Sequence, residues 1–73
     1  MITVTGTIEK KDIGMGAWAL IATDGTTYEL LDCPRDLRQA GLKVKVLGAI
    51  DDDAMTAAMI GKVFNVSSFE KLD

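Results

Sequence analysis

The pair Asp24-Gly25 lies between two apolar-rich runs, in the stretch WALIATDGTTYELL that spans residues 18–31. Asp-Gly flanked by alternating apolar residues is the strongest short-range signal for a β-hairpin. A chain of 73 residues has room for one domain and one core. We therefore expect a single domain, residues 1–73, organised around this hairpin.

Two turn types are possible for this hairpin. They differ by one residue in register, so they place different side chains of residues 26–31 on the same face as Trp18 and Leu20. A two-residue turn would place Glu29 on the same face as Trp18 and Leu20. A three-residue loop, 23–25, with the glycine in the left-handed conformation, is the next most common type. It gathers on one face Trp18, Leu20, Ala22, Tyr28 and Leu30, and on the other Ala19, Ile21, Thr27, Glu29 and Leu31. Because that register buries the aromatic residues and exposes Glu29, we predict the three-residue loop.

Alternation predicts strands on both sides of the hairpin. Residues 2–10 place apolar side chains opposite threonines, and Gly6 interrupts the inward row. A lone glycine in a strand often marks a bend or the close approach of another backbone. Residues 42–50 alternate again, residues 57–60 indicate a return strand broken at Gly61, and residues 63–69 continue it.

Helix punctuation follows the hairpin in the stretch DCPRDLRQAG, residues 32–41. Asp32 or Cys33 can cap a helix, Pro34 suits its first position and Gly41 suits its end. We expect a short helix of about two turns, with Leu37 on its buried side. The predicted core contains Val4, Ile8, Trp18, Leu20, Tyr28, Leu30, Leu37, Val44, Val46 and Phe64.

This order of elements resembles the OB-fold, a five-stranded barrel with a helix between its third and fourth strands. The chain is also similar to small bacterial OB-fold-like proteins that carry a W-x-L-x-x-x-D-G-x-x-Y-x-L hairpin. Its matching residues are Trp18, Leu20, Asp24, Gly25, Tyr28 and Leu30. The resemblance implies an all-β fold with a small α component and a binding surface on the hairpin and on the loops 11–16 and 51–54. An SH3-like barrel is the alternative, which the mid-chain helix disfavours.

The composition argues against several classes of function. There is no histidine and the net charge is −3, so general acid–base catalysis and binding dominated by phosphate contacts are both disfavoured. Cys33 is the only cysteine, which excludes an intramolecular disulfide and a thiolate metal cluster. We expect no enzyme activity and no cofactor. We also expect no membrane span, and a cytoplasmic location.

Two charged groups are candidate binding sites. Asp51, Asp52 and Asp53 supply oxygen ligands, but their spacing differs from that of a calcium loop, so we expect a solvated turn. A weak basic stripe would form if the first and fourth strands were neighbours, from Lys10, Lys11, Lys43, Lys45 and Lys62. Such a stripe would bind single-stranded nucleic acid weakly, which is the alternative function.

The favoured hypothesis is a docking surface on the outer side of the hairpin. The predicted register puts Ile21 and Leu31 outside the barrel, near the loop residues Ile13 and Met15. Contiguous exposed apolar residues mark interaction surfaces. We therefore expect a small binding module that associates with another protein or with a second copy of itself.

Overall fold

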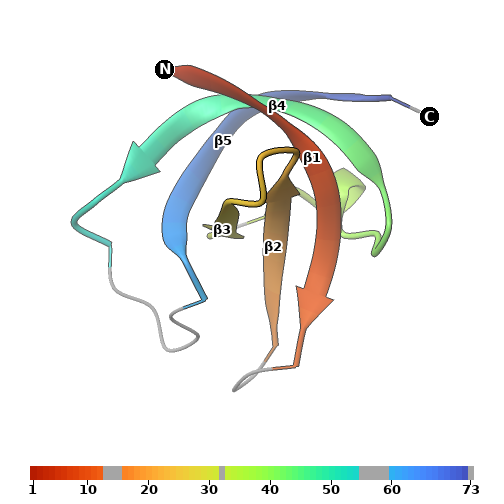
Figure 1. The fold of residues 1–73 in the computed structure, drawn as a ribbon, viewed down its shortest axis with the longest axis horizontal. Helices are drawn as coiled ribbons and strands as arrows, with labels where there is room; N and C mark the ends of the chain where they lie inside the picture. The colour runs from red at the N-terminus through yellow and green to blue at the C-terminus, as the bar shows by residue number, and fades with distance from the viewer. Residues whose placement is uncertain (13–15, 32, 55–59, 73) are drawn as a thin grey trace.

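Five strands form a closed barrel in the computed structural model, which describes residues 1–12, 16–31, 33–54 and 60–72 (Figure 1). The strands are β1 (Ile2–Lys11), β2 (Ala17–Ala22), β3 (Thr27–Leu30), β4 (Lys43–Asp51) and β5 (Lys62–Lys71). Their order around the barrel is β1-β2-β3-β5-β4, in which only the β3–β5 contact is parallel. The prediction of an all-β barrel of five strands is confirmed.

The long first strand is shared between two neighbours, and Gly6 marks the change. β1 pairs with β4 from Ile2 to Thr7 and with β2 from Gly6 to Lys11, so Gly6 has a strand on both sides. A Cβ built on Gly6 would lie 2.2 Å from the backbone oxygen of Ile21. The expectation of a close backbone approach at this glycine is confirmed, since no other residue fits there without a shift.

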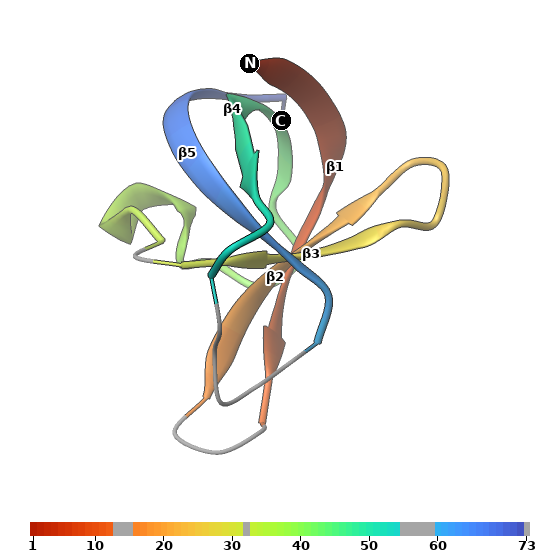
Figure 2. The same cartoon turned by 90° about the vertical axis from the view of Figure 1, so that its left-hand side faces the viewer.

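The β2–β3 hairpin has the predicted register. Leu20 pairs with Tyr28, and the Ala22 N–H donates to the Thr26 carbonyl at 2.8 Å. Gly25 has a φ of +91°, the left-handed conformation that the three-residue loop requires. Figure 2 shows the turn of this hairpin extending away from the rest of the barrel.

The β4–β5 pair contains a β-bulge that explains an irregular apolar spacing in β5. The register runs Leu47 opposite Ser68 and then Gly48 opposite Val66, so Ser67 is the extra residue. A bulge inserts one residue and shifts the alternation by one step. Val66 and Phe69 can therefore both pack against the core although they are three residues apart. The predicted return strand at 57–60 falls largely outside the described residues.

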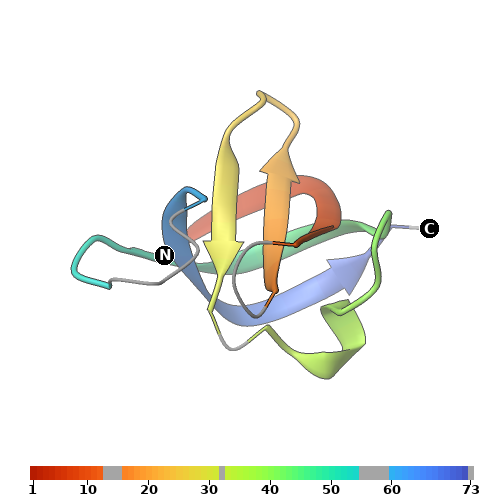
Figure 3. The same ribbon diagram turned by 90° about the horizontal axis from the view of Figure 1, so that it is seen from below.

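The predicted helix over residues 32–41 is wrong, because this segment forms only a single 3-10 turn, η1 (Arg35–Leu37) (Figure 3). Leu37 is buried as expected, and Pro34 precedes the turn. The backbone beyond it bonds to β1 instead of continuing a helix. The Gly41 N–H donates to the Ile8 carbonyl at 2.7 Å, and the Ile8 N–H donates to the Leu42 carbonyl at 2.8 Å.

The core closely follows the alternation that the sequence shows. Its buried members are Val4, Ile8, Leu20, Leu30, Cys33, Leu37, Val44, Val46 and Phe64. Trp18 and Tyr28 were predicted inside and are partly buried against this cluster. Tyr28 meets Phe64 edge to face, with ring centroids 5.5 Å apart. No helix within the described ranges has the length and apolar character needed to cross a membrane.

Candidate functional site

The outer side of the hairpin is covered at its centre. Ala19, Glu29 and Val63 form a row across β2, β3 and β5, since Glu29 pairs with both of the others. Ala19 is 0%, Val63 4% and Glu29 5% exposed. The prediction that Glu29 is solvent-exposed is therefore wrong. Its side chain lies on the outer side with those of Ala19 and Val63, and because all three are buried, this part of the outer face is covered.

The predicted docking residues lie at the ends of this face. Ile21 pairs with Thr27 near the hairpin turn and is half-buried, whereas Leu31 follows β3 and is 40% exposed. The covered row separates the two. The predicted members Ile13 and Met15 fall outside the described residues. Within the described chain, Leu31 is the predicted docking residue with the largest exposure.

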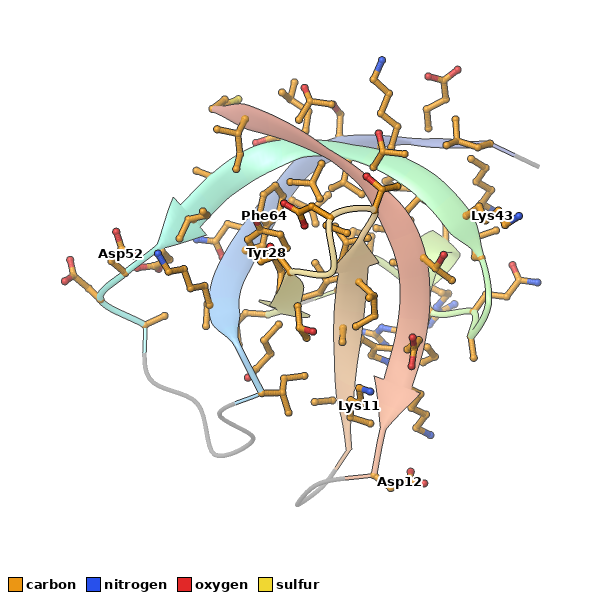
Figure 4. All side chains as sticks on the ribbon, viewed as in Figure 1. Lys11, Asp12, Tyr28, Lys43, Asp52 and Phe64 are labelled. Atoms are coloured by element: carbon orange, nitrogen blue, oxygen red, sulfur yellow. The ribbon has the colours of Figure 1, made fainter. Side chains whose placement is uncertain are left out.

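The five lysines do not form one stripe, although β1 and β4 are neighbours as expected. Lys43 and Lys45 lie on β4 opposite threonines of β1. Lys11 forms an ion pair with Glu9 at 3.4 Å, and the Lys10 ammonium lies 6.0 Å from the Trp18 ring centroid. Figure 4 shows Lys11 and Lys43 in well-separated parts of the barrel. Lys62 begins β5 next to Tyr28.

The acidic segment after β4 is arranged as a turn. The Asp53 N–H donates to Asp51 Oδ1 at 3.1 Å, and Asn65 Nδ2 donates to Asp51 Oδ2 at 3.4 Å. Asp52 and Asp53 are exposed. In the part of the chain that the structure describes, no group of three His, Cys, Asp or Glu side chains is arranged to hold a metal ion.

Cys33 lies in the core and is 3% exposed. Burial raises the pKa of its thiol, and the nearby Arg38 only partly opposes that effect. Arg38 Nε donates to the Cys33 carbonyl at 2.8 Å, which holds the chain where it enters η1. A neutral, buried thiol is a poor nucleophile, so the geometry favours a structural role for Cys33 in the core.

Three further exposed apolar residues lie near the start of β1. Met1 is 81%, Ile2 42% and Leu47 37% exposed. They do not form one face, because Ile2 pairs with Gly48 on the inner side of the sheet, whereas Leu47 pairs with Thr3 on the outer side. A shallow depression of about 250 Å³ beside Leu47 is lined by Thr3, Lys45, Leu47, Ser68, Phe69 and Glu70. The sequence pattern did not mark these residues as a surface, since only the strand pairing brings Leu47 beside the start of β1.

The comparisons with known proteins give no relative for this chain. No protein-family model matches it, and neither a curated protein nor a solved structure matches.

Proposed function

We propose that this protein is a non-catalytic binding module with an OB-fold-like barrel, and that it docks another protein or a second copy through the outer side of the β2–β3 hairpin. The strand order β1-β2-β3-β5-β4, with β3 and β5 parallel, supports the OB-fold-like assignment. The 3-10 turn occupies the place between β3 and β4 where that fold carries its helix.

The exposure of Leu31 is the observation that carries the docking hypothesis. A leucine that is 40% exposed at the end of β3 lies on the same side as Ile21, next to a row that is already buried. A partner that binds at this end of the hairpin would bury Leu31 and so extend the row of buried residues Ala19, Glu29 and Val63. Burial of a leucine side chain contributes about 1.5–3 kcal/mol, which is enough for one residue to matter in a small interface.

Leu31→Ser is the variant that tests this hypothesis, and Leu72→Ser is its matched control. Leu72 is 48% exposed and lies at the end of β5, away from the hairpin. Each variant should fold like the wild type, which a thermal melt checks. We expect affinity capture from a cell extract to show an association that Leu31→Ser removes and Leu72→Ser retains. A monomer that captures no specific partner contradicts the proposal.

Titration with labelled single-stranded oligonucleotides at moderate salt separates this function from the nucleic-acid alternative. The net charge of −3 and the dispersed lysines predict weak binding that salt abolishes. Submicromolar affinity that falls on substitution of Lys43 and Lys45 by alanine would replace the proposal.

A further inference from the structure

The first residues of β1 present an open strand edge. β1 pairs with β4 from Ile2 onward, but its pairing with β2 begins only at Gly6. Among the residues that the structure describes, no strand pairs with residues 2–4 on the side away from β4. Other stretches, among them β5 beyond Phe64 and β4 beyond Gly48, also pair on one side only. The first residues of β1 are a further such edge, where another strand can add.

Two hydrogen bonds establish which backbone groups point to the open edge. The Thr23 N–H donates to the Thr5 carbonyl at 3.0 Å on the β2 side, and the Ile8 N–H donates to the Leu42 carbonyl at 2.8 Å on the β4 side. Backbone groups of successive residues in a strand alternate between its two edges. The N–H and C=O of Thr3 therefore face the open edge, while those of Ile2 and Val4 face β4.

The chemistry of this edge does not prevent pairing. Natural edges are protected by lysine, proline or a bulge, and the segment Ile2–Thr5 consists of four uncharged β-branched residues. Exposed apolar side chains lie in and beside this segment: Ile2 within it is 42% exposed, Met1 before it 81%, and Leu47 opposite Thr3 37%. By contrast, the open stretch of β5 beyond Phe64 ends in the exposed charged residues Glu70 and Lys71.

We propose that two copies of this chain pair antiparallel along the open edge, around a two-fold axis at Thr3. In that register Thr3 lies opposite the second copy's Thr3, and Ile2 lies opposite the second copy's Val4. Each Thr3 N–H donates to the other copy's Thr3 carbonyl, because the same groups point outward in both copies. The contact is isologous, so the segment meets its own sequence, and the paired threonine and aliphatic side chains are favourable cross-strand neighbours.

The contact is short, which sets its strength. The hydrogen bond from Thr23 to Thr5 occupies the edge just beyond Val4, so the added strand covers only three residues. A stable interface needs roughly 800 Å² from each partner. The three-residue contact is too short to bury this much surface, so we expect a weak dimer whose population rises with protein concentration. It uses none of the hairpin residues and stands or falls separately from the proposed docking of Leu31.

A cysteine at the axis tests the register directly. Hydrogen-bonded residues in an antiparallel pair have Cα atoms about 5.5 Å apart, and their Cβ atoms are farther apart than the roughly 3.5–4.5 Å of a relaxed disulfide. A short bifunctional thiol cross-linker spans this separation, so it should join two copies of Thr3→Cys into a covalent dimer. Ser68→Cys is the matched control, because Ser68 is exposed on the outer side of β5. The native Cys33 is buried and should not contribute. Equal rates of cross-linking in the two variants would overturn the register.

Thr3→Pro tests the pairing without cross-linking. Proline removes the one N–H that faces the open edge and leaves the β4 ladder complete, whereas Thr3→Val keeps that N–H. In sedimentation at rising concentration, wild type and Thr3→Val should dimerise, and Thr3→Pro should stay monomeric while its circular dichroism remains that of the wild type. If the Pro variant misfolds, the cross-linking result decides. A wild type that stays monomeric throughout overturns the inference, and dimerisation lost in Leu31→Ser but kept in Thr3→Pro assigns association to the hairpin face.

Discussion

Two rows of outward-facing residues cross the barrel, and they differ sharply in exposure. On the hairpin side, Ala19, Glu29 and Val63 are all buried. In the β1–β4–β5 sheet, the equivalent row of Thr5, Lys45 and Glu70 is exposed throughout. Both rows point away from the core and both contain an acid. Strand alternation therefore determines which face of the barrel a side chain occupies, whereas its burial depends on what packs against that face.

A charge introduced into each row should give the largest contrast. Ala19→Asp places a carboxylate at a site that is 0% exposed, and an uncompensated buried charge costs on the order of 3–5 kcal/mol. Thr5→Asp, in the exposed row, should change the free energy of unfolding by less than about 0.5 kcal/mol. Urea denaturation of both variants measures the difference. Equal losses would mean that the hairpin side is not covered.

The stability of the fold should be almost as sensitive to a substitution in β1, the strand that pairs with both β2 and β4. A Cβ at Gly6 would meet the Ile21 backbone at 2.2 Å, and backbone cannot move aside as the end of a side chain can. Gly6→Ala should therefore destabilise the fold by about 1–3 kcal/mol, as overpacking does. Thermal unfolding beside Gly25→Ala, where the space is open but φ is positive, separates crowding from backbone strain. A Gly6→Ala variant with wild-type stability would contradict the close approach of the β1 and β2 backbones at this point.

Removal of the acidic side chain from each row should also change the free energy of unfolding more in the buried row than in the exposed row, with a smaller difference than the introduced charge gives. Glu29 is 5% exposed and takes part in an interaction within the fold. Glu29→Ala should cost about 1–3 kcal/mol, since the groups around a buried polar side chain lose their partner. Glu70→Ala should lie within about 0.5 kcal/mol of wild type. Chemical denaturation of the pair checks this prediction, and a larger loss for Glu70 would reverse the assignment of the two rows.

The smallest expected effect lies at the tip of the hairpin. The Thr26 N–H donates to Asp24 Oδ1 at 2.9 Å, and this hydrogen bond lowers the pKa of the Asp24 carboxyl. Because the folded-state pKa is the lower one, the ionised form stabilises the fold above the unfolded-state pKa. That contribution is lost as the pH falls through the folded-state value. Asp24→Asn should remove a small part of the acid sensitivity, and stability measured against pH in wild type and variant tests this.

The contrast between the rows also explains what the sequence could reveal. The register of the hairpin was predictable, because Gly25 permits a left-handed turn and the apolar residues select one face. The hairpin register already placed Ala19 beside Glu29, but alternation carries no information about the parallel pairing with Val63 of β5 or about what covers this row, so the burial of Glu29 was missed.

The short helix was overpredicted for a similar reason. Local punctuation at Pro34 and Gly41 agrees with a helix, but the backbone groups of Gly41 and Leu42 bond to Ile8, a residue far away in the sequence. A segment of this length gains little from helix formation alone, so tertiary hydrogen bonds prevail. The exposed edge at Ile2 likewise follows from the pairing of strands and not from the local pattern.

We propose that this barrel meets other protein molecules through the few apolar residues left exposed at the margins of its covered side and at the open edge of β1. The most direct test is the amide spectrum of isotope-labelled protein as the concentration of unlabelled protein rises. We predict shifts that cluster at Leu31 or at Ile2, Thr3 and Val4, with the exposed row around Lys45 unchanged. A spectrum that stays the same at every concentration, together with shifts at the lysines on addition of a single-stranded oligonucleotide, would contradict the account.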